Sequence, residues 1–198
     1  MGQVSRQRFR GQIAGVGTTS GVRVVVGRWD ESPYGAFADV MVETDDGHRV
    51  LLAPTREVAD FVAATYIFDE VRVEPITVNG WVLSSDSLAL ELGVGRRTGL
   101  GRLLRVVPPR VAESPAWCTV TDPVAQVVMR GVRTRGTAGN GRREWYGATD
   151  VHAVVSVSGR FDGTDLGGLA PVDPPPSFGF SSTPRRPSVT TVVTTVAE

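Results

Sequence analysis

Lysine is absent from this sequence of 198 residues, and all 21 basic side chains are arginines. This absence excludes a lysine Schiff base, a pyridoxal-phosphate linkage and the lysine of a phosphate-binding P-loop. Cysteine occurs once, at Cys118, so no internal disulfide can form, which agrees with a reducing compartment. Residues 1–10 also lack the apolar core of a signal peptide. We therefore expect a cytoplasmic protein.

Long apolar runs, an excess of charge and metal-ligand patterns are absent as well. No apolar run reaches the roughly 18 residues of a membrane span. Acidic and basic residues balance at 21 each, whereas nucleic-acid binding normally requires a basic excess. Two histidines and one cysteine give no zinc-type spacing. We expect no membrane span, no nucleic-acid partner, no metal and no cofactor.

Valine is abundant, with 33 residues, and its β-branched side chain favours pleated structure. Two turn sequences, Thr44-Asp-Asp-Gly47 and Asn79-Gly80, predict hairpins because Asp, Asn and Gly tolerate positive φ. Thr55 can cap a short helix whose apolar residues recur at helical spacing. The expected strands are 8–16, 22–29, 36–43, 48–52, 70–78 and 81–92, and the expected helix is 56–66.

The middle of the chain differs from the rest. Residues 96–135 are rich in arginine and predict a two- or three-helix insertion near 96–131. Strand patterns return at 145–159 and at 188–196, on either side of a proline-rich loop at 171–188.

The order of these elements predicts a single domain, residues 1–198, of the α+β class with a predominantly antiparallel sheet curled into a half-barrel or β-barrel. A β-rich half (1–95) is followed by the arginine-rich helical insertion (96–135) and a β-rich closing part (136–198).

The most distinctive segment is Trp29-Asp-Glu-Ser-Pro-Tyr-Gly-Ala-Phe-Ala-Asp-Val-Met-Val42. It resembles the Ser-Pro-x-Gly-x-aromatic-x-acid stretch of acetoacetate decarboxylase-like proteins, where it enters a strand of a β-barrel with an interior pocket. The matching positions are Ser32, Pro33, Gly35, Phe37 and Asp39. Those decarboxylases form their Schiff base on a lysine, which this chain lacks. The resemblance therefore implies the fold and a pocket for small acidic or apolar ligands, and not the decarboxylation.

Asp150 and His152 lie two residues apart on a predicted strand, so their side chains share one face of the sheet. An acid beside a histidine can fix its tautomer and raise its basicity. This pair is the candidate for acid–base catalysis, with a polar, solvated strand face as the alternative interpretation.

Candidate ligand-binding residues are the aromatic side chains that could line a pocket and the arginines of the glycine-rich loop 136–143. Such a loop can bring backbone N–H groups together around an anion, although a flexible connection is the plainer interpretation. The candidates are Trp29, Tyr34, Phe37, Trp81, Arg142, Arg143, Trp145 and Tyr146.

Three functional hypotheses follow. The first is a protein that binds a small, largely apolar or acidic molecule in a β-barrel pocket. The second is a lysine-independent enzyme in which His152 and Asp150 form the acid–base pair. The third is an interaction module that forms a homodimer through edge-to-edge pairing of strand 188–196.

Overall fold

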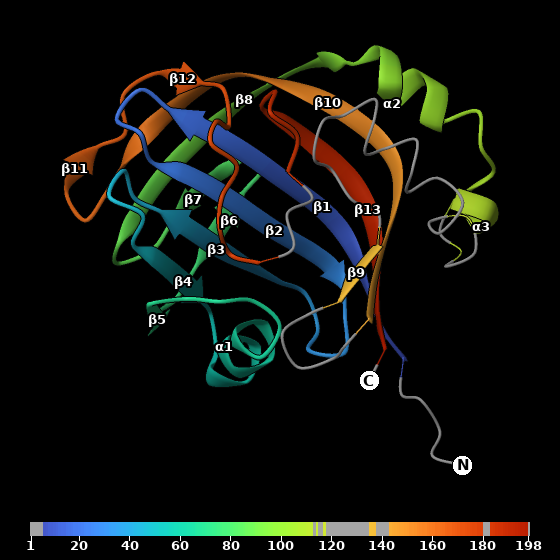
Figure 1. The fold of residues 1–198 in the computed structure, drawn as a ribbon, viewed down its shortest axis with the longest axis horizontal. Coiled ribbons are helices and arrows are strands. Elements are labelled where there is room, and N and C mark those ends of the chain that lie inside the picture. The colour runs from blue at the N-terminus through green and yellow to red at the C-terminus, as the bar shows by residue number, and fades with distance from the viewer. Residues whose placement is uncertain are drawn as a thin grey trace.

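The computed structural model describes residues 6–112, 114, 117, 135–137, 143–179 and 183–197. Its strands form one sheet, ordered β5-β4-β3-β2-β1-β13-β10-β8-β7-β6 (Figure 1). All neighbours on this path are antiparallel except β4 and β5. The strands on the path are β1 (Arg6–Thr18), β2 (Arg23–Glu31), β3 (Phe37–Glu43), β4 (Arg49–Ala53), β5 (Glu70–Val73), β6 (Thr77–Asn79), β7 (Val82–Ser84), β8 (Leu88–Arg97), β10 (Arg143–Phe161) and β13 (Ser188–Ala197). The short strands β9 (Arg135–Thr137) and β11 (Thr164–Asp165) pair with β10, and β12 (Leu169–Ala170) pairs with β1.

The sheet is strongly curled, which confirms the predicted half-barrel (Figure 1). The wall made by β1–β4 faces the wall made by β7, β8 and part of β10. Val24 and Val40 of the first wall share one buried apolar cluster with Leu83 and Leu90 of the second. We call the side of β1–β4 that meets this cluster the inner face. Because successive side chains alternate along a strand, the remaining side chains of β1–β3 point to the opposite, outer face.

Helix α1 (Arg56–Ala63) packs against the outer face, after strand β4 as predicted. Thr55 is its N-cap and accepts a hydrogen bond from the backbone N–H of Val58. Val58 and Val62 are buried and contact Leu51 in a second apolar cluster. The helix connects β4 to β5, and this crossover explains why these two strands are parallel.

The proline-rich segment, described at residues 171–179 and 183–187, also crosses the outer face (Figure 1). Glycines on β1 make room for it. A Cβ atom at Gly15 would lie 2.2 Å from Cγ2 of Thr183, and one at Gly17 would lie 2.2 Å from the carbonyl oxygen of Pro171. The absence of these side chains therefore allows the segment to lie directly on the strand.

Two expected strands are each broken in two. The expected strand 70–78 ends at Val73 and resumes as β6, with Pro75, which cannot donate a backbone hydrogen bond, in the gap. The expected strand 81–92 is interrupted after Ser84. There the buried carboxylate of Glu74 accepts hydrogen bonds from the hydroxyls of Ser85 and Ser87 and stabilises a turn.

The expectation that strand 188–196 offers a free edge is wrong. Strand β13 occupies these residues, but β1 pairs with it on one side and β10 on the other. Its backbone groups are thus used within the sheet, and edge-to-edge pairing with a second copy through this strand is excluded. The edges of the path are β5 and β6.

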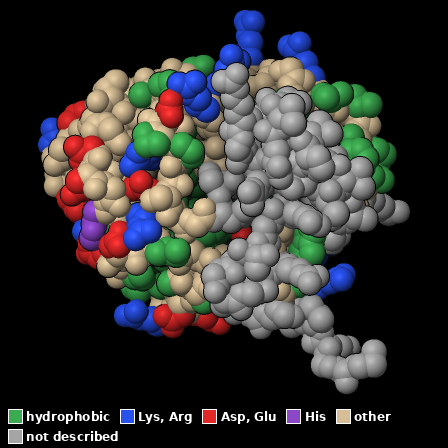
Figure 2. Space-filling view, viewed as in Figure 1, with side chains coloured by type: hydrophobic (Ala, Val, Ile, Leu, Met, Phe, Trp, Pro, Cys, Tyr) green, Lys and Arg blue, Asp and Glu red, His purple; other side chains and the backbone are tan. Residues whose placement is uncertain are grey.

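The region expected to be a helical insertion begins later than predicted, because β8 continues to Arg97. Helices α2 (Gly99–Leu104) and α3 (Pro109–Ala112) follow, and the hydroxyl of Thr98 caps α2. Much of the remaining insertion lies outside the described residues. Leu103 and Val106 are exposed. Apolar side chains gather at the right of Figure 2, the side on which Figure 1 shows α2 and α3. No helix of the described part of the chain is long and apolar enough to cross a membrane.

Candidate functional site

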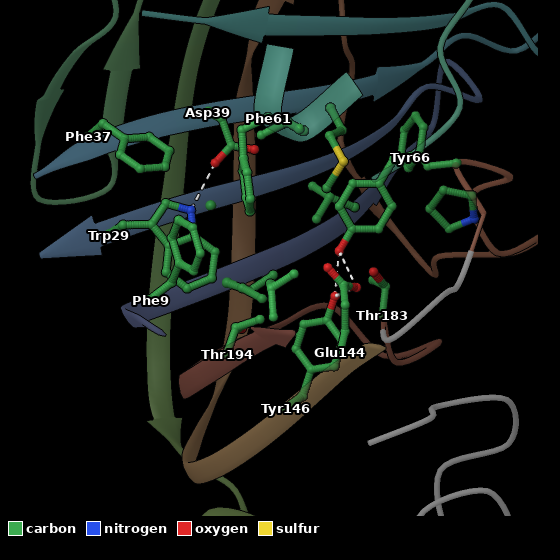
Figure 3. A pocket seen from close by; sticks show the side chains of 18 residues that line it. Phe9, Trp29, Phe37, Asp39, Phe61, Tyr66, Glu144, Tyr146, Thr183 and Thr194 are labelled. Carbon is green, nitrogen blue, oxygen red and sulfur yellow. Dashed lines mark hydrogen bonds between the residues drawn. The ribbon is translucent and has the colours of Figure 1, made fainter. Parts of the chain in front are cut away.

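A cavity of about 70 Å³ lies on the outer face of the sheet, away from the main core of the half-barrel. Odd-numbered side chains of β1–β3 form its floor, and side chains of β10, β13, α1 with the following Tyr66, and the proline-rich segment complete its walls (Figure 3). Its lining residues are Phe9, Ile13, Val25, Gly27, Trp29, Phe37, Asp39, Met41, Phe61, Val62, Tyr66, Glu144, Tyr146, Pro176, Phe178, Thr183, Thr194 and Val196.

A tight turn between β2 and β3 positions one end of this cavity. The backbone N–H of Gly35 donates to the carbonyl of Ser32, and the Ser32 hydroxyl donates to the carbonyl of Gly35. Gly35 has φ of +78°, which disfavours other residues. This turn sets the register in which Phe37 lies opposite Trp29, so both side chains reach the cavity.

Asp39 is a buried acid in the wall of the cavity, with a relative exposure of 4%. Its Oδ1 accepts a hydrogen bond of 2.9 Å from the indole N–H of Trp29 (Figure 3). Burial raises the pKa of Asp39 to about 7, and the Trp29 hydrogen bond only partly opposes this rise. The carboxyl group therefore changes between its protonated and ionised forms near neutral pH, as general acids, general bases and charge-selective binding groups do.

Gly27 makes the Asp39–Trp29 contact possible. It lies opposite Asp39 in the sheet, and a Cβ atom there would be 2.4 Å from Asp39 Oδ1 and 2.7 Å from Trp29 Nε1. Any other residue at this position would push the two partners apart.

An aromatic cluster surrounds this end of the cavity. Phe9 is its centre: its ring stacks on Phe61 at a centroid distance of 5.0 Å and meets the edge of Trp29 at 5.6 Å. Phe37 and Tyr34 contact Phe9 at 6.5 Å and 6.2 Å. These edge-to-face and offset contacts hold the rings in fixed orientations.

The other end of the cavity is polar. The hydroxyl oxygens of Tyr146 and Tyr66 lie 2.9 Å and 3.2 Å from the same carboxylate oxygen of Glu144 and also contact each other, so their two O–H protons are shared among three contacts (Figure 3). Burial, together with the charge of Glu144, raises the pKa of both phenols well above 10, so they stay neutral donors. The Thr194 side chain is buried nearby, and its hydroxyl has no hydrogen-bond partner among the described residues.

The proline-rich segment is tied down where it covers the cavity. The buried carboxylate of Glu43 accepts hydrogen bonds from the backbone N–H and the hydroxyl of Ser177, and its other oxygen accepts from Arg23 at 2.9 Å. The backbone N–H of Ile67 donates to the carbonyl of Phe178 at 2.7 Å. These contacts fix the two lining residues Pro176 and Phe178 beside α1.

The residues proposed from the sequence fall into three groups. Trp29, Phe37 and Tyr146 line the cavity, and Tyr34 packs behind it against Phe61. Trp81 lies elsewhere, against the main core cluster. Trp145, next to Tyr146 in β10, is partly buried and is not among the lining residues. Arg142 and the side chain of Arg143 lie outside the described residues.

Arg97 is the main hydrogen-bond partner of Asp150, the acid of the predicted Asp150–His152 pair. Both oxygens of Asp150 accept from Nε of Arg97, at 2.8 and 2.9 Å. His152 Nε2 is 3.6 Å from Asp150 Oδ2, and its Nδ1 is 3.2 Å from the carbonyl oxygen of Gly95. Burial is the largest single influence on Asp150 and opposes its ionisation, but the hydrogen bonds from Arg97 and the backbone N–H of Val151, together with the charge of Arg97, outweigh it and lower the pKa of Asp150. The aspartate thus joins β8 to β10 as an ion pair.

Several lining residues were missed from the sequence. Glu144 and Tyr66 meet although 78 positions separate them, and no local pattern connects them. Two of them could have been found from the sequence. Phe61 belongs to the apolar stripe of α1, and Asp39 is the acidic position of the stretch that resembles acetoacetate decarboxylase-like proteins. Phe9 is a lone aromatic residue in a polar stretch and gave no such signal.

Comparisons with protein-family models, with curated proteins and with solved structures give no match for this chain. Within the described ranges, no group of three or more His, Cys, Asp or Glu side chains is arranged to hold a metal ion.

Proposed function

We propose that this protein binds a small, largely apolar molecule in the outer-face cavity. The observation that carries the proposal is a cavity with mostly apolar, aromatic walls and two buried carboxyl groups, Asp39 and Glu144, at its opposite ends. Such a combination is typical of ligand sites, in which apolar walls supply affinity and a few polar groups fix orientation. The Phe37 and Asp39 positions of the acetoacetate decarboxylase-like resemblance both line this cavity, which supports a pocket-based function. The single cysteine favours a cytoplasmic location.

An acidic ligand is less favoured than an apolar one. The two charged groups among the described lining residues, Asp39 and Glu144, are both acidic. Asp39 in its ionised form, which no described cation neutralises, would repel a carboxylate ligand in a low-dielectric site.

The enzyme hypothesis based on His152 has less support. Asp150 is engaged by Arg97, and His152 is beyond hydrogen-bond distance from it. Neither residue lines the cavity. Asp150 instead forms an ion pair with Arg97 that connects β10 to β8.

Native mass spectrometry of the freshly purified protein tests the binding function. We expect an additional mass that disappears on denaturation, and we expect its loss when Ile13, which lines the cavity, is replaced by the larger Phe. Gln12→Phe is the matched control, because residue 12 points to the opposite face of β1. A bare native mass, together with no binding from a panel of small aliphatic and aromatic compounds, would contradict the proposal.

A further inference from the structure

The charge on the cavity wall points to the kind of ligand. Asp39 lies in the wall, and Trp29 is the one described side chain that hydrogen-bonds to it, through Oδ1. The described lining residues include no arginine and no histidine. The chain has no lysine, so it cannot supply an ammonium group of its own from a side chain. Among the described lining residues, none supplies a cation for Asp39, so this side of the cavity is open to a cation that a ligand brings.

The aromatic walls point in the same direction. The faces of aromatic rings carry partial negative charge and attract cations, ammonium groups in particular. Phe9, Trp29, Phe37 and Phe61 all line the cavity, and Figure 3 shows Asp39 among Trp29, Phe37 and Phe61. A carboxylate framed by aromatic rings is favourable for an organic ammonium ion, because the rings stabilise the charge while they contact the attached hydrocarbon.

We propose that the cavity selects small organic amines, with the ammonium group bound by the Asp39 carboxylate and the hydrocarbon part packed against the surrounding aromatic side chains. This inference rests on the proposed binding function and specifies its ligand class. Trp29 is a positioning residue in this site, because its indole N–H holds Oδ1 and orients the carboxyl group.

The size of the cavity limits the amine. Its volume of about 70 Å³ is roughly half that of an engineered cavity of about 150 Å³ that binds benzene. An aliphatic amine of about three to five carbon atoms is therefore the best match. Isobutylamine and its neutral counterpart isobutanol are suitable probes, since they share a hydrocarbon group and differ in charge.

Binding of an amine should depend on pH in a defined direction. Asp39 must lose its proton to pair with an ammonium group, and its pKa is raised to about 7, while the amine stays protonated. We expect affinity to rise by about five- to tenfold from pH 6 to pH 8 and then to level off. The other titratable groups of the cavity, Glu144 and the phenols of Tyr66 and Tyr146, lie at its opposite end, and the phenols stay neutral over this range.

Isothermal titration calorimetry with the full chain decides the matter. At pH 8, Asp39→Asn should weaken isobutylamine binding by about tenfold or more and leave isobutanol binding within about twofold. Asparagine retains an oxygen that can accept from Trp29, so the fold should persist. Asp30→Asn makes the same change of charge at an exposed position of β2 and serves as the control.

The outcomes separate the inference from the function on which it rests. If isobutanol binds as tightly as isobutylamine, or if amine affinity falls as the pH rises, the amine assignment is wrong and the binding function stands. If neither probe binds at millimolar concentration, and a wider panel of neutral compounds also fails, both are wrong. The pH series uses the unchanged protein, so the test does not depend on the variant.

Discussion

Asp39 couples the stability of this protein to pH. Its folded-state pKa is raised from 3.8 to about 7, so the folded state holds a proton that the unfolded state releases. The stability that this difference provides is fully present below pH 4 and is lost as the pH rises to 7.

We expect the free energy of unfolding of the wild type, relative to Asp39→Asn, to fall by about 4 kcal/mol between pH 4 and pH 8. Urea denaturation of both proteins at several pH values measures this difference. Parallel stability curves for the two proteins would show that Asp39 titrates normally in the folded state.

Gly27 sets the geometry of the same carboxyl group. Because an added Cβ would lie 2.4 Å from Asp39 Oδ1, Gly27→Ala should disrupt the Trp29 hydrogen bond and destabilise the protein by about 1–3 kcal/mol. Gly99→Ala is the control, since its added Cβ would meet no described atom of another segment within 4 Å. Equal unfolding free energies for these two variants would contradict the close packing at Gly27.

At the scale of elements, one buried ion pair links the sheet to the proline-rich segment. Arg23 and Glu43 are 7% and 5% exposed, and Glu43 also holds Ser177. Removing one charge of a buried pair leaves the other without compensation.

Glu43→Gln should therefore destabilise the protein by about 3 kcal/mol or more and should loosen the segment that covers the cavity. Chemical denaturation gives the first quantity, and the rate of limited proteolysis within residues 171–179 reports the second. Glu91→Gln, an exposed change on β8, should alter neither. Unchanged proteolysis in Glu43→Gln would mean that the contact with Ile67 is enough to hold the segment.

For the whole molecule, the central position of β13 in the sheet determines how the two halves of the chain hold together. This strand joins the N-terminal half of the sheet to the C-terminal half, because it pairs with β1 and β10 over most of its length. An interruption there breaks two ladders, whereas an interruption in the edge strand β6 breaks one.

Thr191→Pro in β13 should abolish cooperative folding, while Thr77→Pro in β6 should leave a folded protein of reduced stability. Circular dichroism during thermal unfolding distinguishes the two. A cooperative transition in Thr191→Pro would show that the halves of the sheet hold together without continuous pairing through β13.

The sequence alone determined the local features of this protein. Thr55 and the apolar stripe after it predicted α1, and the Asp-Gly and Asn-Gly turns predicted two hairpins, because each depends on residues within a few positions of one another. The order of the predicted strands and helices likewise predicted a curled, mostly antiparallel sheet. Trp29, Phe37 and Tyr146 were identified as pocket residues from their aromatic character.

The tertiary structure decided everything that depends on distant partners. It placed the last strand in the middle of the sheet, put the cavity on the outer face, and bound Asp150 to Arg97 instead of leaving it to His152. It also joined Glu144 to Tyr66 and buried Asp39, which raised its pKa. Strand order and burial arise from contacts between segments far apart in the chain, and a local pattern holds no information about which distant segment will cover it.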